Sequence, residues 1–188
     1  MTHTETTPGI VSRTLQLEDA DSLDGAVRAF EPKVLALFGS GTRGAVLRGD
    51  WLGHAIHPPL TDLVIGTWTS ATILDVIGGK DSSAAAQRLI AVGLAAFGPT
   101  AWTGWAEWSQ AGPREKRVGL VHALSNAVSV GFYGASWLAR RRGRHGTGAS
   151  LALAGAGVSS VAAYLGGHMV SVRKVGSHHP AYDAPADV

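Results

Sequence analysis

Residues 151–172 read LALAGAGVSSVAAYLGGHMVSV and contain no lysine, arginine, aspartate or glutamate. A stretch of this kind is long enough to cross a bilayer, because roughly 20 helical residues at about 1.5 Å each span about 30 Å of hydrocarbon. Three earlier stretches, residues 58–78, 89–108 and 118–138, also reach that length without a lysine or arginine. The sequence therefore predicts an all-α integral membrane protein, a four-helix bundle whose helices run up and down.

Positive charge lies between these stretches and after the last one. Residues 114–117 follow the second stretch, residues 140–144 follow the third, and Arg173 and Lys174 follow the fourth. This distribution is typical of membrane proteins. A soluble helical bundle is the alternative, since the mean hydropathy is only +0.12. Soluble helices carry a polar stripe, however, whereas residues 149–163 offer only serine, glycine and aliphatic side chains.

The chain divides into four parts by composition. Residues 1–20 are polar at the start and are predicted to form a disordered tail. Residues 21–50 carry apolar side chains at helical spacing, broken by Pro32 and by Gly39-Ser40-Gly41, and are predicted to form short amphipathic helices at the membrane interface. Residues 51–175 form the four-span domain, and residues 176–188 are expected to be a mobile tail.

Several functions are excluded by composition. There is no cysteine, which rules out disulfides, iron–sulfur ligation by this chain and covalent attachment of haem. No phosphate-binding glycine motif or nucleophile elbow is present. The net charge of +2 comes largely from the joints between spans, so nucleic acid is not an expected partner. We expect the protein not to be an enzyme on its own and at most a component of electron transfer.

Four histidines are predicted to converge on one membrane face, which we call side A, the face where the first span begins. His54 and His57 precede the first span, His122 lies about one turn inside the third, and His168 lies about one turn before the end of the fourth. Ionisable groups inside a membrane are costly and normally face the bundle interior, where they have a role. The four histidines therefore form the candidate site.

Further polar and aromatic residues are expected to surround these histidines. Asp62 and Glu107 have no lysine or arginine within the spans to pair with, so histidine is the partner predicted for them. Asn126 follows His122 by one turn, and Trp105 and Trp108 are expected to form an aromatic wall. Asp75 lies near the opposite face, side B, and is expected to be a helix-end hydrogen bonder outside the site.

Three chemistries fit this set of residues. Haem b would use two axial histidines at matched depth, with His122 and His168 as the preferred pair and His57 as the substitute. A divalent metal would use the same histidines, His54 included, with one carboxylate. The third possibility is a structural or proton-handling network that holds no cofactor. Spacing alone does not separate the three.

The order of short motifs along the chain resembles a bacterial membrane family catalogued as domain of unknown function 2231. The resemblance rests on LGHAIHP (residues 52–58), LTDLVIG (60–66), PTA (99–101), VGLVH (118–122) and YLGGH (164–168). It covers about residues 50–176. Ala55 stands where the family usually has proline, and Glu107 stands where it usually has aspartate.

The resemblance implies a four-helix membrane domain of undefined activity. Similar domains are fused to Rieske iron–sulfur or c-type cytochrome domains, which implies a role beside electron transfer and a redox partner such as a Rieske-type or cytochrome protein. It also implies a multi-pass protein of the bacterial cell membrane with both termini in the cytoplasm. Charge does not decide this orientation, because the two faces carry similar numbers of basic residues.

Overall fold

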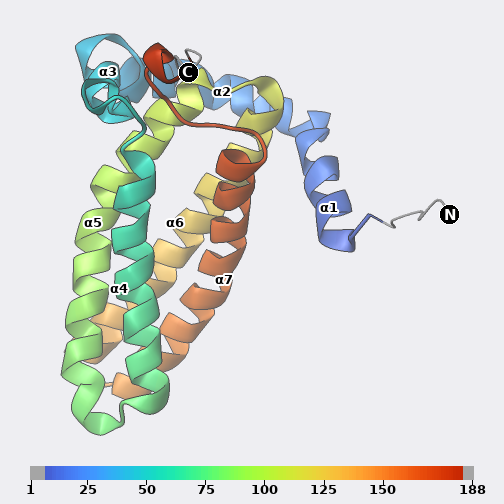
Figure 1. The fold of residues 1–188 in the computed structure, drawn as a ribbon. Helices are drawn as coiled ribbons and strands as arrows, with labels where there is room; N and C mark the ends of the chain where they lie inside the picture. Colours follow the sequence, from blue (N-terminus) through green and yellow to red (C-terminus); the bar gives the residue numbers. More distant parts are fainter. Residues whose placement is uncertain (1–6, 184–188) are drawn as a thin grey trace, which may run out of the picture.

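Four long helices form the body of the protein in this computed structural model, which describes residues 7–183 without the side chain of Lys80 (Figure 1). They are α4 (His57–Ile77), α5 (Ser83–Gln110), α6 (Pro113–Arg141) and α7 (His145–Ser171). All four are long and apolar enough to cross a membrane. The predicted all-α membrane bundle of four up-and-down helices is confirmed.

Local sequence explains where these helices begin and why they exceed the apolar stretches. Pro58 and Pro59 occupy the first turn of α4, and Pro113 begins α6. Proline suits these positions because an N–H there has no partner within the helix. The helices α5, α6 and α7 continue past their apolar parts into the polar joints, since charged side chains at a helix end can reach the membrane interface.

The bundle is built from two helical hairpins. The helix α4 packs against α5, and α6 packs against α7; α5 also contacts α6, and α4 contacts α7. This order places α4 diagonally opposite α6. Both of these helices run from side A to side B, so a rotation about an axis along the bundle converts one hairpin into the other.

Functionally similar positions of the two hairpins recur in the sequence at a constant spacing. A shift of 65 residues converts His57 into His122, Trp68 into Tyr133, and Asp75 into Arg140. The members of the last two pairs meet inside the bundle, the first in its middle and the second near side B. The rings of Trp68 and Tyr133 stack with centroids 4.0 Å apart, and Arg140 donates to Asp75 across 2.5 Å. The two hairpins are therefore equivalent halves around a pseudo-two-fold axis.

The pair between Asp75 and Arg140 corrects two expectations. Arg140 belongs to α6 and is 1% exposed, and Asp75 is 5% exposed. Arg140 also donates from Nε to Ser136 Oγ across 3.2 Å, and its stem lies against Gly148 of α7. No lysine or arginine lies within the apolar stretches, so the sequence predicts no basic partner for Asp75 and places Arg140 in the joint after the third stretch. Both predictions are wrong, because the last turn of α6 carries Arg140 back into the bundle.

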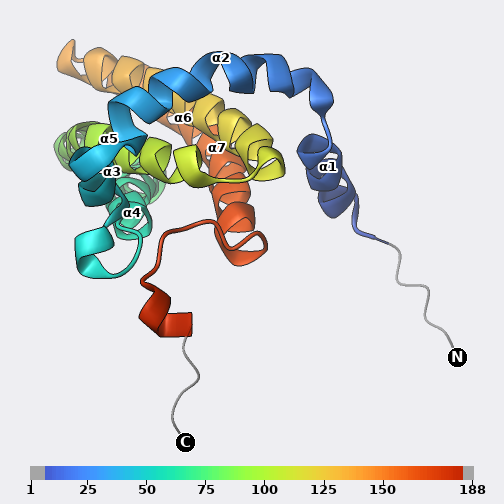
Figure 2. The same ribbon diagram turned by 90° about the horizontal axis from the view of Figure 1, so that it is seen from above.

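The N-terminal residues form helices at the side A end. They are α1 (Gly9–Glu18), α2 (Asp24–Val34) and α3 (Gly41–Arg48), with short turns of helix at Asp21–Leu23, Leu35–Gly39 and Asp50–Leu52. Figure 2 shows α2 crossing above α6, with α3 beyond its far end. Val27 and Val34 are buried against Trp108, whereas Phe30 is 48% exposed. The helices α2 and α3 lie within residues 21–50, where short amphipathic helices were predicted.

The predicted disordered tail over residues 1–20 is wrong for Gly9–Glu18, which form α1; residues 1–6 lie outside the described part. The helix is held by polar bonds that its sequence did not suggest. Thr14 Oγ1 lies 3.2 Å from the hydroxyl of Tyr164. Glu18 is 1% exposed and accepts from His168 Nε2 and Arg173 Nε, each at 2.6 Å. These side-chain bonds tie α1 to α7, and α1 also packs against α6.

We expect acid to weaken this docking. The hydrogen bonds from Arg173, followed by that from His168, hold the pKa of Glu18 below its usual range despite burial. A carboxyl whose folded pKa is depressed stabilises the fold above its unfolded pKa and loses that contribution as pH falls. Glu18→Gln should therefore lower the melting temperature at pH 7, and its difference from the wild type should shrink below about pH 4.

Asp19→Asn is the matched control for this prediction, because the Asp19–Arg114 ion pair is about 60% exposed on both sides and exposed pairs contribute little. A Glu18→Gln difference of the same size at pH 7 and at pH 3 would contradict the expectation.

The C-terminal segment is also more ordered than expected. Residues 53–55 pair with residues 177–179 through a bridge between His54 and His178, with Ala55 N donating to Ser177 O across 2.7 Å. A short 3-10 helix follows at Pro180–Asp183. The expectation of a mobile tail is corrected for residues 176–183, and residues 184–188 lie outside the described part.

Close packing of α4 against α5 within the first hairpin makes one glycine critical. A Cβ at Gly93 of α5 would lie 2.2 Å from Trp68 Nε1, and Trp68 cannot withdraw because it is 3% exposed and stacked on Tyr133. Gly93→Ala should therefore cost about 1–3 kcal/mol of stability, measured as a lower melting temperature in detergent.

Gly131 of α6 provides the comparison. A Cβ there meets no atom within 4 Å, so Gly131→Ala should leave stability unchanged or raise it by up to about 1 kcal/mol. Equal melting temperatures for the Gly93 and Gly131 variants would refute the packing argument.

Candidate functional site

A cavity of about 640 Å³ lies between the two hairpins, and all four long helices line it. It reaches from His57 near side A to Tyr133 in the middle of the bundle. The Trp68–Tyr133 stack lies at that inner end, and the Asp75–Arg140 pair lies further toward side B. The cavity thus belongs to the side A half of the bundle, as the histidine pattern indicated.

His57 lies on the α4 wall of the cavity with a defined tautomer. Its Nδ1 is 2.9 Å from the carbonyl oxygen of Thr100 in α5. A carbonyl only accepts, so Nδ1 carries the hydrogen and the neutral ring keeps its lone pair on Nε2. The ring lies over Gly104, where a Cβ would be 2.8 Å from Cε1. Glycine is therefore needed for the ring to occupy this place.

His122 repeats this arrangement in the second hairpin. Its Nδ1 donates to the carbonyl of Ala162 in α7 across 2.8 Å. Its ring lies over Gly166, where a Cβ would be 3.0 Å from Cε1. Asn126 Nδ2 donates to Nε2 across 3.0 Å. In the first hairpin the corresponding contact is weaker, since Thr61 Oγ1 is 3.5 Å from His57 Nε2.

The two histidines are thus equivalent positions that line one cavity. A shift of 62 residues converts Thr100 and Gly104 into Ala162 and Gly166, so each ring is held by the same two features of its partner helix. A backbone carbonyl that binds Nδ1–H orients the ring and makes Nε2 the ligand-binding nitrogen. Among the predicted site residues, the structure brings together His57 and His122.

His168 lies elsewhere. It does not line the cavity, and its Nε2 bonds to Glu18 of α1. The structure therefore does not place His122 and His168 as a facing pair, although their depths are similar. Residue spacing predicted the depth of His168 in the membrane but not the side of α7 on which it lies. That side is set by Glu18, which belongs to a segment expected to be disordered.

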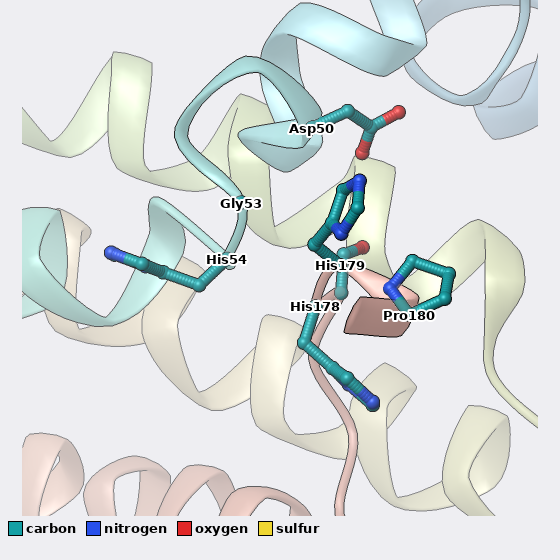
Figure 3. A pocket seen from close by; sticks show the side chains of 7 residues that line it. Asp50, Gly53, His54, His178, His179 and Pro180 are labelled. Carbon is teal, nitrogen blue, oxygen red and sulfur yellow. The ribbon is translucent and has the colours of Figure 1, made fainter. Parts of the chain in front are cut away.

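His54 also points away from the cavity. Its Nδ1 donates to the carbonyl of Ala55 across 3.0 Å. Figure 3 shows its ring directed away from His178 and His179, which belong to a small surface pocket of about 120 Å³. His178 instead lies 3.0 Å from Asp183. The described residues contain no group of three or more histidine and carboxylate side chains placed to hold a metal.

The two predicted carboxylates both line the cavity but differ in environment. Asp62 is exposed and makes no side-chain hydrogen bond within residues 7–183. Glu107 is 7% exposed, and its Oε2 accepts from the N–H and the hydroxyl of Ser177, each at 2.9 Å. Its Oε1 is buried without a hydrogen-bond partner in the described part. Neither carboxylate bonds to a histidine, contrary to the expectation.

Trp105 and Trp108 form part of the cavity wall, as expected. Their rings meet edge to face with centroids 5.4 Å apart, and Trp108 Nε1 donates to the carbonyl of Lys116 across 2.9 Å. Sequence reasoning missed Trp68, Tyr133 and Ser159, which also line the cavity. The signal that could have found Trp68 and Tyr133 is their equal spacing from His57 and His122, respectively.

Comparison of the chain with curated proteins and with solved structures gives no significant match. A family model described as "Predicted membrane protein (DUF2231)" matches residues 53–179. That range contains the four helices, the cavity and both of the histidines that line it. Since the match spans well over half of the sequence, the chain belongs to this family of predicted membrane proteins.

Proposed function

We propose that this protein is a redox-associated membrane module whose cavity binds a redox-active molecule between His57 and His122. The observation that carries the proposal is the repeated histidine geometry. Two equivalent rings from opposite halves line one cavity, and each donates its Nδ1–H to a neighbouring helix. Sites that use histidine to hold a cofactor or to exchange hydrogen bonds with one have this construction.

Haem b agrees with these residues in one respect and disagrees in another. His57 and His122 would hold it, Trp105 and Trp108 would lie beside it in the cavity wall, and haem would supply reversible one-electron chemistry. The carboxylates Asp62, Glu107 and Glu115 line the cavity, however, and no lysine or arginine does so among its lining residues. The two propionates of haem would meet like charge, so haem b does not fit the cavity as a whole.

A non-redox module is the second candidate function. It is favoured by the bond between Asn126 and His122, because that ring already has a partner at both nitrogens without any ligand. An ion path along the bundle axis is a poorer explanation, since the Trp68–Tyr133 stack and the Asp75–Arg140 pair occupy the centre beyond the cavity. A structural or proton-handling network limited to side A is therefore the form of this candidate that we retain.

The experiment that tests the proposal analyses what the purified protein carries. The protein is purified in mild detergent, its oxidised and dithionite-reduced spectra are recorded, and the same sample is extracted with organic solvent and analysed for metals. We expect near one redox-active molecule per chain. A folded protein with no chromophore, no extractable redox compound and no metal would overturn the proposal in favour of the non-redox network.

The partner and the orientation form part of this proposal. A separate Rieske-type or cytochrome protein would exchange electrons with the site at side A, which is the end nearer to both histidines. In this proposal side A faces the cytoplasm, so both termini lie there. A reporter fused after Val188 should be active only inside the cell, and activity only outside would reverse the orientation.

A further inference from the structure

We infer that the molecule bound between His57 and His122 is a neutral, lipid-soluble quinone or quinol that reaches the cavity from the bilayer between α4 and α7. This inference rests on the proposed function and narrows it to one class of molecule. Charge, hydrogen-bonding capacity and the route of access each support it.

The charge of the lining favours a neutral ligand. Asp62, Glu107 and Glu115 line the cavity and no lysine or arginine is among its lining residues, so in a medium of low dielectric constant an anion would be repelled. A metal cation would need several ligands together, and no such group is found over residues 7–183. A quinone ring carries no charge in its fully oxidised or fully reduced state.

The hydrogen-bonding groups of the cavity suit the two oxygens of such a ring. His57 presents Nε2, which accepts a hydrogen bond from a quinol hydroxyl while its Nδ1–H is occupied. His122 Nε2 already accepts from Asn126, whose amide has a second N–H that can donate to a ligand oxygen in the cavity. Glu107 adds a buried oxygen, Oε1, that has no partner within the described residues. Leaving such a group unpaired is costly, so a ligand hydroxyl near Oε1 would relieve that cost.

The route of access follows from exposure. Ile65 of α4 is 41% exposed and Val170 of α7 is 46% exposed, although both line the cavity. The helix α7 also carries three small residues that both line the cavity and are exposed, namely Ser160, Ala163 and Gly167. The cavity therefore opens sideways at the level of the spans. An isoprenoid tail can lie in this opening, and the tryptophan walls can flank the ring.

The test measures binding of a decyl-chain benzoquinone to the full chain in nanodiscs by quenching of tryptophan fluorescence, with Trp105 and Trp108 as reporters. We expect saturable binding at one site. Ala163→Phe should fill the opening and weaken binding at least tenfold, whereas Val161→Phe should leave it unchanged, because Val161 is 55% exposed and does not line the cavity. Gly167→Leu is the second blocking variant, and gel filtration checks the fold of each.

The outcomes separate this inference from the proposed function. A wild type that carries haem and shows no saturable quinone binding would overturn the quinone and leave the redox module standing. Quinone binding that is equally strong in the wild type, Ala163→Phe and Gly167→Leu would overturn the site and its opening. A wild type that binds no quinone and carries no redox compound would overturn both.

Discussion

Arg140→Met is expected to lower the stability of the bundle by about 3–5 kcal/mol, because it leaves the Asp75 carboxylate buried without its partner. Asp75 is 5% exposed, and α4 offers it no other basic side chain at that depth. Asp75→Asn should be similarly severe, since it leaves the guanidinium of a 1% exposed arginine uncompensated. The measurement is the melting temperature in detergent, read by light scattering and by gel filtration of the heated sample.

The double variant Asp75→Leu with Arg140→Met decides whether the lost pair is the cause. Replacing both members of a buried pair by apolar side chains is often neutral or stabilising, so the double variant should recover most of the stability. Arg142→Met is the matched control, because Arg142 is exposed just beyond the end of α6. A double variant as unstable as Arg140→Met alone would show that packing, rather than charge, is responsible.

His57→Ala and His122→Ala are each expected to reduce affinity for the bound redox molecule at least tenfold, which corresponds to about 1.4 kcal/mol. The loss should be larger for His57→Ala, because Nε2 of His57 has only a 3.5 Å contact with Thr61, whereas Nε2 of His122 already accepts from Asn126. The measurement is the amount of redox molecule that copurifies, together with rebinding to the stripped protein.

His168→Gln and His54→Ala provide the controls for this experiment. Neither residue lines the cavity, since His168 bonds to Glu18 and His54 bonds to its neighbouring carbonyl. His168→Gln should lower stability but leave the amount of bound molecule unchanged. Loss of the molecule in His168→Gln, with retention in His57→Ala, would restore His122 and His168 as the pair and overturn the assignment made from the structure.

Sequence reasoning succeeded where hydrophobic length controls the outcome. Four apolar stretches predicted four crossing helices because every backbone polar group must be bonded within a span, and the depth of His57 and His122 followed from counting residues along those helices. It failed for Gly9–Glu18, whose polar residues are buried only because Tyr164, His168 and Arg173 lie opposite them. A partner that is distant in the chain leaves no local signal.

The sequence by itself determined the membrane class and the number of spans, since these depend on the run of apolar residues and on rise per residue; it also predicted the face that carries the candidate site. Only the tertiary structure decided which side chains share that site. The rotation of α7 turns His168 toward α1, and the pseudo-two-fold packing brings His57 and His122 to one cavity while it joins Asp75 to Arg140. The rotation of each helix about its own axis depends on how the four helices pack together, and residue spacing along one helix does not specify it.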